Sequence, residues 1–146
     1  MAIYDCFQYF NEDHIVDIRL NILDKYVDYF VISESNMTHQ GHKKKLNFDI
    51  NNFPKFKDKI IYVPLTKQPD NLRKVKKEDS ILVKNSKILD NALLRENFQR
   101  NFLSTQIKNF QEDDLIIISD LDEIPNLEKF KYKKKITFFE QKMFYY

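Results

Sequence analysis

A run of four apolar residues that ends abruptly in carboxylates constrains this chain more than any other feature. The sequence reads Leu115-Ile116-Ile117-Ile118 and then Ser119-Asp120-Leu121-Asp122-Glu123-Ile124-Pro125. A short apolar run bounded by turn residues is typical of a buried strand. In open α/β sheets, ligands bind outside the carboxyl ends of the strands. The run therefore predicts an α/β fold with acidic groups at the mouth of the sheet.

Asp120 and Asp122 alternate within the acidic segment. Residues i and i+2 of an extended chain point the same way, so we expect both carboxylates to face one point. Mg²⁺ and Mn²⁺ take oxygen ligands and are often shared between protein carboxylates and substrate phosphates. From the residues alone, a metal–diphosphate site and a plain acidic turn after a strand both remain open.

The composition narrows the class of protein. The 146 residues suffice for one domain with a core, and the hydrophobic content of 42% excludes disorder. The net charge of +2 predicts no nucleic-acid partner. The single cysteine, Cys6, excludes an internal disulfide, and neither a membrane span nor a signal peptide is evident, so we expect a cytoplasmic protein. The single glycine, Gly41, excludes a glycine-rich phosphate loop.

Short apolar runs predict the other strands, and apolar residues at three- and four-residue spacing predict the helices. Strands are expected over residues 3–7, 29–33 and 60–64, and helices over residues 13–25 and 89–110. The first helix is expected to bury Ile15, Ile18, Ile22 and Tyr26, and the second Leu94, Phe98, Phe102, Leu103, Ile107 and Phe110. Residues 67–87 are interpreted as a long loop, and residues 136–146 as one or two strands. This order of elements predicts a parallel sheet with helical crossovers.

Two polar segments are candidates for binding. Residues 34–42 follow a buried-type strand, where loops often carry function, although an ordinary turn with Gly41 at positive φ is the alternative. Arg95, Gln99 and Arg100 lie on the longest predicted helix, where arginine replaces the lysine of other surface stretches. Arginine suits bidentate recognition of phosphate or carboxylate, and a solvent face with ion pairs is the alternative.

Together these segments resemble glycosyltransferase family 17. The matching pieces, in the family's order, are Tyr4-Asp5-Cys6-Phe7 with Phe10-Asn11-Glu12, Glu34-Ser35-Asn36 with Thr38-His39-Gln40-Gly41, Arg95-Glu96 with Gln99-Arg100-Asn101, and Ser119 to Pro125. The resemblance covers nearly the whole chain and implies a GT-A-like, Rossmann-like α/β domain that uses a nucleotide sugar. Because family members usually run further, we expect residues 1–146 to be a single domain that is truncated at its C-terminus.

The resemblance also implies roles for individual residues. Asp120 and Asp122 would hold Mn²⁺ or Mg²⁺ against the donor diphosphate, where the metal neutralises charge on the departing nucleotide. Residues expected to line the nucleotide pocket or pair with phosphate are Tyr4, Asp5, Glu34, Arg95 and Arg100. The donor implied by the family's founding activity is UDP-N-acetylglucosamine, and the acceptor is a glycan or another hydroxyl compound. No residue is assigned as the general base that such a transfer needs.

Two other functions compete with glycosyl transfer. A non-catalytic module would bind a nucleotide sugar or a partner without transferring anything. A phosphatase of the haloacid dehalogenase type would use Asp120 as nucleophile and Asp122 as acid and base, but that motif normally opens its domain, whereas here it lies close to the end of the sequence. An exposed edge of a truncated sheet further predicts self-association into a homo-oligomer.

Overall fold

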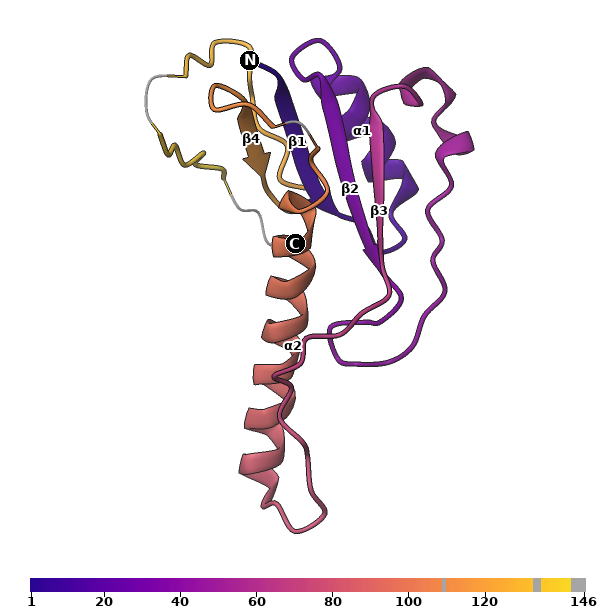
Figure 1. The fold of residues 1–146 in the computed structure, drawn as a ribbon, viewed down its shortest axis with the longest axis vertical. Helices are drawn as coiled ribbons and strands as arrows, with labels where there is room; N and C mark the ends of the chain where they lie inside the picture. The colour runs from indigo at the N-terminus through magenta and orange to yellow at the C-terminus, as the bar shows by residue number, and fades with distance from the viewer. Residues whose placement is uncertain (109, 133–134, 143–146) are drawn as a thin grey trace.

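Four parallel strands form the centre of the structure, in the order β3-β2-β1-β4 (Figure 1). They are β1 (Ile3–Gln8), β2 (Tyr29–Ser35), β3 (Ile60–Leu65) and β4 (Leu115–Ile118). The structure is a computed structural model that describes residues 1–108, 110–132 and 135–142. The parallel α/β sheet predicted from the sequence is confirmed, and the arrangement agrees with a GT-A-like, Rossmann-type fold.

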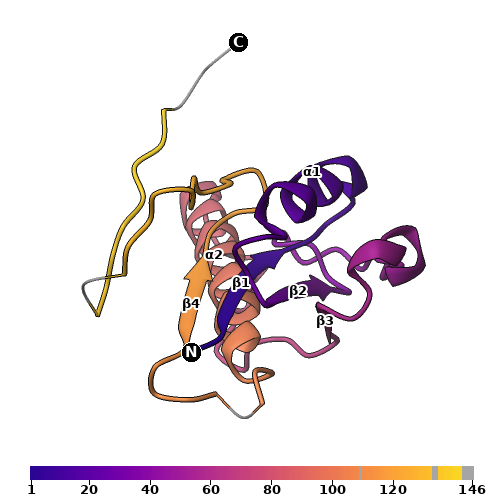
Figure 2. The same ribbon diagram turned by 90° about the horizontal axis from the view of Figure 1, so that it is seen from above.

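Helices connect the strands and cover opposite faces of the sheet (Figures 1 and 2). α1 (Asp13–Leu23) joins β1 to β2, and α2 (Ile81–Ser104) lies between β3 and β4. Short 3₁₀ turns, η1 (Ile50–Asn52) and η2 (Pro54–Phe56), precede β3. Successive strand residues face opposite sides, so β1 packs Phe7 on the α1 side and Cys6 on the α2 side. The core therefore consists of two apolar layers separated by the sheet.

α1 buries only part of the apolar row expected, since Ile15 and Tyr26 are partly buried and pack against the core. Ile18 and Ile22 are 49% and 48% exposed, so their predicted burial is wrong. The buried residues of the helix are Val16, Arg19, Leu20 and Leu23. The helix carries two apolar rows with helical spacing, and spacing alone does not show which row faces the sheet. The row that packs inward carries Arg19 into the core with it.

α2 begins at Ile81, inside the segment that the sequence predicted to be a loop, and ends at Ser104 rather than near residue 110. The Ser80 side chain caps its N-terminus by accepting a hydrogen bond from the Val83 amide. The first half of the helix projects away from the sheet, as Figure 1 shows. It therefore has no buried apolar face from which the sequence could reveal a helix, because Leu82 and Leu89 are 82% and 70% exposed.

The end of the chain differs from the prediction as well. Residues 135–142 contain no strand, so the strand expected from residue 136 is wrong there, and residues 143–146 lie outside the described part. The outer strands of the sheet are β3 and β4. Self-association through such an edge stays a prediction. No helix within the described ranges is long and apolar enough to cross a membrane.

Candidate functional site

A pocket of about 640 Å³ opens at the carboxyl ends of the strands. Segments that follow three of the strands, together with one side of α2, provide its walls. Its lining includes Gln8, Tyr9 and Phe10 at the end of β1, Ser35 and residues 37–40 at the end of β2, residues 120–122 after β4, and Glu96 and Gln99 of α2. Ligands of open α/β sheets bind at this end, so the pocket is the candidate site.

Asp120 and Asp122 both line this pocket, and both also line a neighbouring hollow beside residues 137–142. The Asp120 Oδ1 accepts a hydrogen bond of 2.9 Å from Arg100 Nη2, and the same guanidinium pairs with Glu96 at 3.2 Å. Both aspartates are exposed. The structure thus brings three of the predicted site residues, Asp120, Asp122 and Arg100, to one place.

The donor set fits a hard cation that is shared with a phosphate. Mg²⁺ in such sites uses one or two protein carboxylates and completes its coordination with water and substrate phosphates. Two exposed carboxylates on one loop meet that need. Among the described residues, the structure brings together no group of three His, Cys, Asp or Glu side chains that could hold a metal ion.

Arg19, on the buried side of the acidic loop (residues 119–124), binds the backbone of the loop. Arg19 Nη1 donates to the carbonyl oxygens of Asp120 at 2.7 Å, Leu121 at 3.0 Å and Glu123 at 3.3 Å. Its Nε and Nη2 each donate to a carboxylate oxygen of Asp5 at 2.8 Å. The sequence analysis missed Arg19. The signal that finds it is the row Val16, Leu20 and Leu23, because position 19 lies on the same helical face.

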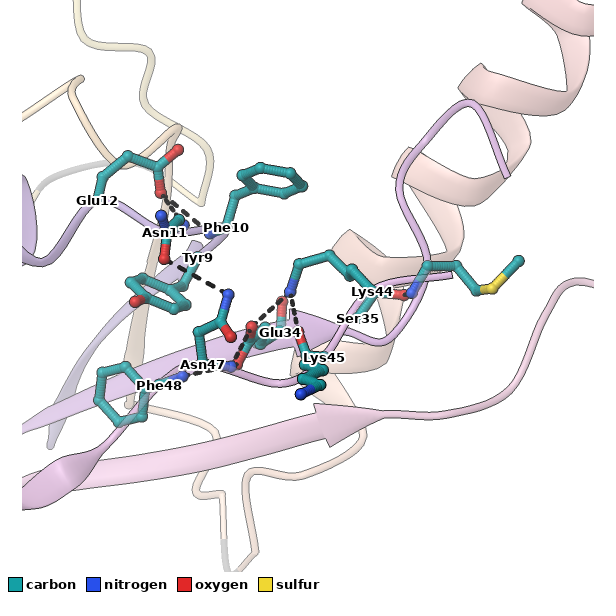
Figure 3. A network of polar contacts seen from close by, with 12 residues as sticks. Tyr9, Phe10, Asn11, Glu12, Glu34, Ser35, Lys44, Lys45, Asn47 and Phe48 are labelled. Carbon is teal, nitrogen blue, oxygen red and sulfur yellow. Dashed lines mark hydrogen bonds and ion pairs between the residues drawn. The ribbon is translucent and has the colours of Figure 1, made fainter. Parts of the chain in front are cut away.

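Asp5 and Glu34, which were expected to line the nucleotide pocket, are fully buried on the α1 side of the sheet. The Asp5 carboxylate faces Arg19. The Glu34 carboxylate accepts hydrogen bonds from Lys44 Nζ and from the Asn47 amide at 2.8 Å (Figure 3). It also accepts a hydrogen bond of 2.9 Å from the Tyr62 hydroxyl. Burial and this hydrogen bond raise the pKa of Tyr62 well above its usual range. Glu34 therefore ties the segment after β2 to the end of the sheet.

The segment after β2 folds into a small hairpin at the rim of the pocket. The Thr38 amide donates to the His42 carbonyl at 2.8 Å, and Gly41 has a positive φ of 93°, which agrees with the alternative of an ordinary turn. Arg95 fastens the hairpin to α2, because its Nη1 donates to the His39 carbonyl at 3.1 Å. A Cβ at position 41 would lie 2.8 Å from Arg95 Nη2. Arg95 thus makes structural contacts at the rim.

Of the two residues Tyr4 and Gln99, only Gln99 lines the candidate pocket. Tyr4, a predicted pocket residue, lies in the first half of β1, where its ring stacks on Tyr29 with centroids 5.1 Å apart. It lines a separate hollow near the amino ends of the strands. Gln99 was a candidate for binding with a solvent face as the alternative; it is only 4% exposed, which excludes the solvent face, and its amide donates to the Ser33 carbonyl at 3.1 Å. Gln99 joins α2 to β2 beside the pocket.

Three curated relatives, from Homo sapiens, Rattus norvegicus and Mus musculus, are similar to this chain over 123 residues at 28% identity. Each is named beta-1,4-mannosyl-glycoprotein 4-beta-N-acetylglucosaminyltransferase, and the match covers 79% of this chain and 20% of the relative. The chain thus spans about a fifth of the length of these relatives. No solved structure matches significantly.

A family comparison covers almost every residue of the chain. The model of glycosyltransferase family 17 matches residues 1–145, which include both halves of the sheet, the pocket and the acidic loop. The resemblance carried by four short segments in the sequence is therefore supported along the whole length. The chain belongs to glycosyltransferase family 17.

Proposed function

We propose that this chain binds the donor of a metal-dependent glycosyltransferase in the pocket at the carboxyl ends of the strands. The observation that carries the proposal is the presence of Asp120 and Asp122 in that pocket, on a loop that directly follows β4. Two exposed carboxylates at this place suit a divalent cation that bridges to a diphosphate. The names of the relatives make an N-acetylglucosamine donor, UDP-N-acetylglucosamine, the first candidate.

Individual residues take the following proposed roles. Asp120 and Asp122 would hold Mn²⁺ or Mg²⁺, which when bound supplies positive charge to stabilise the departing nucleotide diphosphate. In the structure, the Arg100 guanidinium pairs with Asp120. Its second partner, Glu96, would keep the guanidinium beside the pocket when Asp120 binds a metal ion instead. Arg100 would then face the phosphates, to which arginine binds well. The acceptor would be a glycan or another hydroxyl compound.

Calorimetry with UDP-N-acetylglucosamine tests this proposal, first with Mn²⁺ and then with the metal chelated. We expect binding that depends on the metal and that weakens at least about tenfold in Asp122→Ala. Asp58→Ala is the matched control, because Asp58 is an exposed carboxylate that precedes β3 at the other end of the sheet. Its affinity should equal that of the unmodified protein.

Other outcomes would contradict the proposal. Equal affinity with and without the chelator would show that donor binding does not need the metal. Unchanged affinity in Asp122→Ala would show that the acidic loop is not part of the donor site. A product assay then separates two functions. Transfer or donor hydrolysis indicates an enzyme, whereas tight binding without product indicates a non-catalytic module. Release of phosphate from an aryl phosphate would instead indicate the phosphatase.

A further inference from the structure

One buried guanidinium joins α1, β1 and the acidic loop. Arg19 of α1 and Asp5 of β1 are both fully buried, and the pair lies directly beneath the loop that carries Asp120 and Asp122. Figure 2 shows the segment after β4 running toward α1. We propose that the Asp5–Arg19 pair is a positioning device that fixes the acidic loop in its metal-binding shape. This inference rests on the proposed function of Asp120 and Asp122.

The two sides of the guanidinium serve different partners. Nε and one hydrogen of Nη2 go to Asp5, while Nη1 reaches the backbone carbonyls of the loop. Nη2 also donates to Ser119 Oγ at 2.7 Å. A planar fork with five donors can bind a carboxylate on one edge and several carbonyls on the other, which lysine cannot do. Arg19 therefore satisfies carbonyl groups that follow β4 and point inward.

Asp5 makes this arrangement possible in the core. A lone buried charge costs several kcal/mol, so a guanidinium at this depth needs a carboxylate with good geometry. Asp5 supplies both oxygens at 2.8 Å, and the Phe7 ring lies 4.7 Å from the guanidinium carbon. The pair acts as one unit, with Asp5 holding Arg19 and Arg19 holding the loop.

The loop reinforces the same atoms from within. The Glu123 amide donates to the Asp120 carbonyl at 3.0 Å, and the Ile124 amide donates to the Asp122 carbonyl at 3.1 Å. Ser119 Oγ donates to the Glu123 carbonyl at 2.9 Å. Arg19 thus contacts both ends of a turn whose backbone is already closed. Carbonyls of this turn accept hydrogen bonds from Arg19, while Asp120 and Asp122 are residues that line the pocket.

The expected consequence is a loss of metal affinity when the support is weakened. Groups that orient metal ligands without touching the metal typically change affinity by about 10–100-fold when they are replaced. Arg19 lies behind the carboxylates and contacts neither of them in the structure's hydrogen bonds, so it is a positioning residue. Its replacement should act on the shape of the loop and not on the charge in the pocket.

The test compares Arg19→Lys and Ser119→Ala with the unmodified protein by two measurements. Calorimetry gives the affinity for UDP in the presence of Mn²⁺, and hydrogen exchange gives the protection of amides 119–124. For Arg19→Lys we expect the dissociation constant to rise about 10–100-fold and exchange to accelerate in the loop while β1 and β2 keep their protection. Ser119→Ala removes one Arg19 contact together with the hydrogen bond from Ser119 to the Glu123 carbonyl, and it should show the same pattern more weakly.

Lys59→Gln is the matched control. Lys59 Nζ also binds backbone carbonyls and a carboxylate, those of Val27 and Asp24, but at the amino end of the sheet. It should lower stability and leave both UDP affinity and loop exchange unchanged. If Arg19→Lys does not fold, Ser119→Ala decides alone.

Two failures are distinguishable. If the variants change neither hydrogen exchange in the loop nor the affinity for UDP, the positioning role of Arg19 is overturned, whereas the proposed donor site is not. If the unmodified protein does not bind UDP with Mn²⁺, the proposed function is overturned, and with it the metal-binding part of this inference. In that case faster hydrogen exchange of amides 119–124 in Arg19→Lys would still show that Arg19 stabilises the conformation of the loop.

Discussion

Among single residues, the buried carboxylate of Glu34 is the clearest test of how polar groups are held in the core. Its oxygens accept from Lys44, from the amides of Asn47 and Phe48 and from Tyr62. Glu34→Gln would turn one acceptor into a donor that faces other donors and would remove the carboxylate that pairs with the Lys44 ammonium. We expect the free energy of unfolding to fall by about 3–5 kcal/mol, measured by urea denaturation. Glu128→Gln, an exposed site, is the control.

Cys6 gives a second prediction at this scale. The thiol is buried between β1 and α2, and burial raises its pKa to about 12. Because the thiolate is the reactive form, Cys6 should resist an alkylating reagent at pH 8 and react fully in denaturant. Mass spectrometry of the labelled protein checks this. Rapid labelling without denaturant would show that the core opens at this strand.

Among the elements, the hairpin after β2 depends on its glycine. Gly41 combines a φ of 93° with a close approach to Arg95, so any side chain meets strain and a clash. Gly41→Ala should cost about 1–2 kcal/mol and displace Arg95 from the hairpin. The hairpin amides should then exchange faster than in the unmodified protein, while α1 remains as protected as before. Equal exchange in the hairpin would show that the turn adapts without loss.

The projecting half of α2 leads to the opposite prediction. Leu82 and Leu89 are largely exposed on a helix end that extends beyond the sheet. Replacing both by glutamate should change the free energy of unfolding by no more than about 0.5 kcal/mol, because surface substitutions remove little packing. Thermal denaturation of Leu82→Glu/Leu89→Glu provides the measurement. A large loss of stability would mean that this face is covered in solution.

The comparison of these elements shows what sequence patterns can predict. The apolar run at β4 predicted a parallel strand with Asp120 and Asp122 at its end, because burial and register follow from local sequence. Arg19 was missed because a charged residue on a buried helix face is recognised only when its partners are known, and these lie far away in the sequence. The start of α2 was missed because residues 81–90 of the helix include no buried residue.

For the molecule as a whole, three separate carboxylates make stability sensitive to acid. The pKa of Asp24 is lowered chiefly by hydrogen bonding to Lys59, that of Asp79 by the Lys76 amide, and that of Asp114 by the Ala2 amide. A folded pKa below the unfolded value gives stability that is present above about pH 4 and is lost as the pH falls through the folded pKa.

Urea unfolding at pH 7, 5 and 3 should therefore show a free energy that drops between the last two points. Asp114→Asn should be less stable than the unmodified protein at pH 7 and should lose less between pH 5 and pH 3. An equal loss of unfolding free energy in both proteins would show that Asp114 does not contribute to the sensitivity to acid.

The place of β1 in the sheet also has a consequence for how the protein is made. β1 is the second strand from the β4 edge of the sheet and pairs with both β2 and β4. β4, however, follows β1 by more than a hundred residues in the sequence. At ribosomal speeds of about 5–20 residues per second, one edge of β1 waits for roughly 5–20 s before its partner emerges. During that wait an apolar strand edge is open to other chains, and Arg19 has no acidic loop to hold. The candidate site is therefore the last part of the sheet to be assembled.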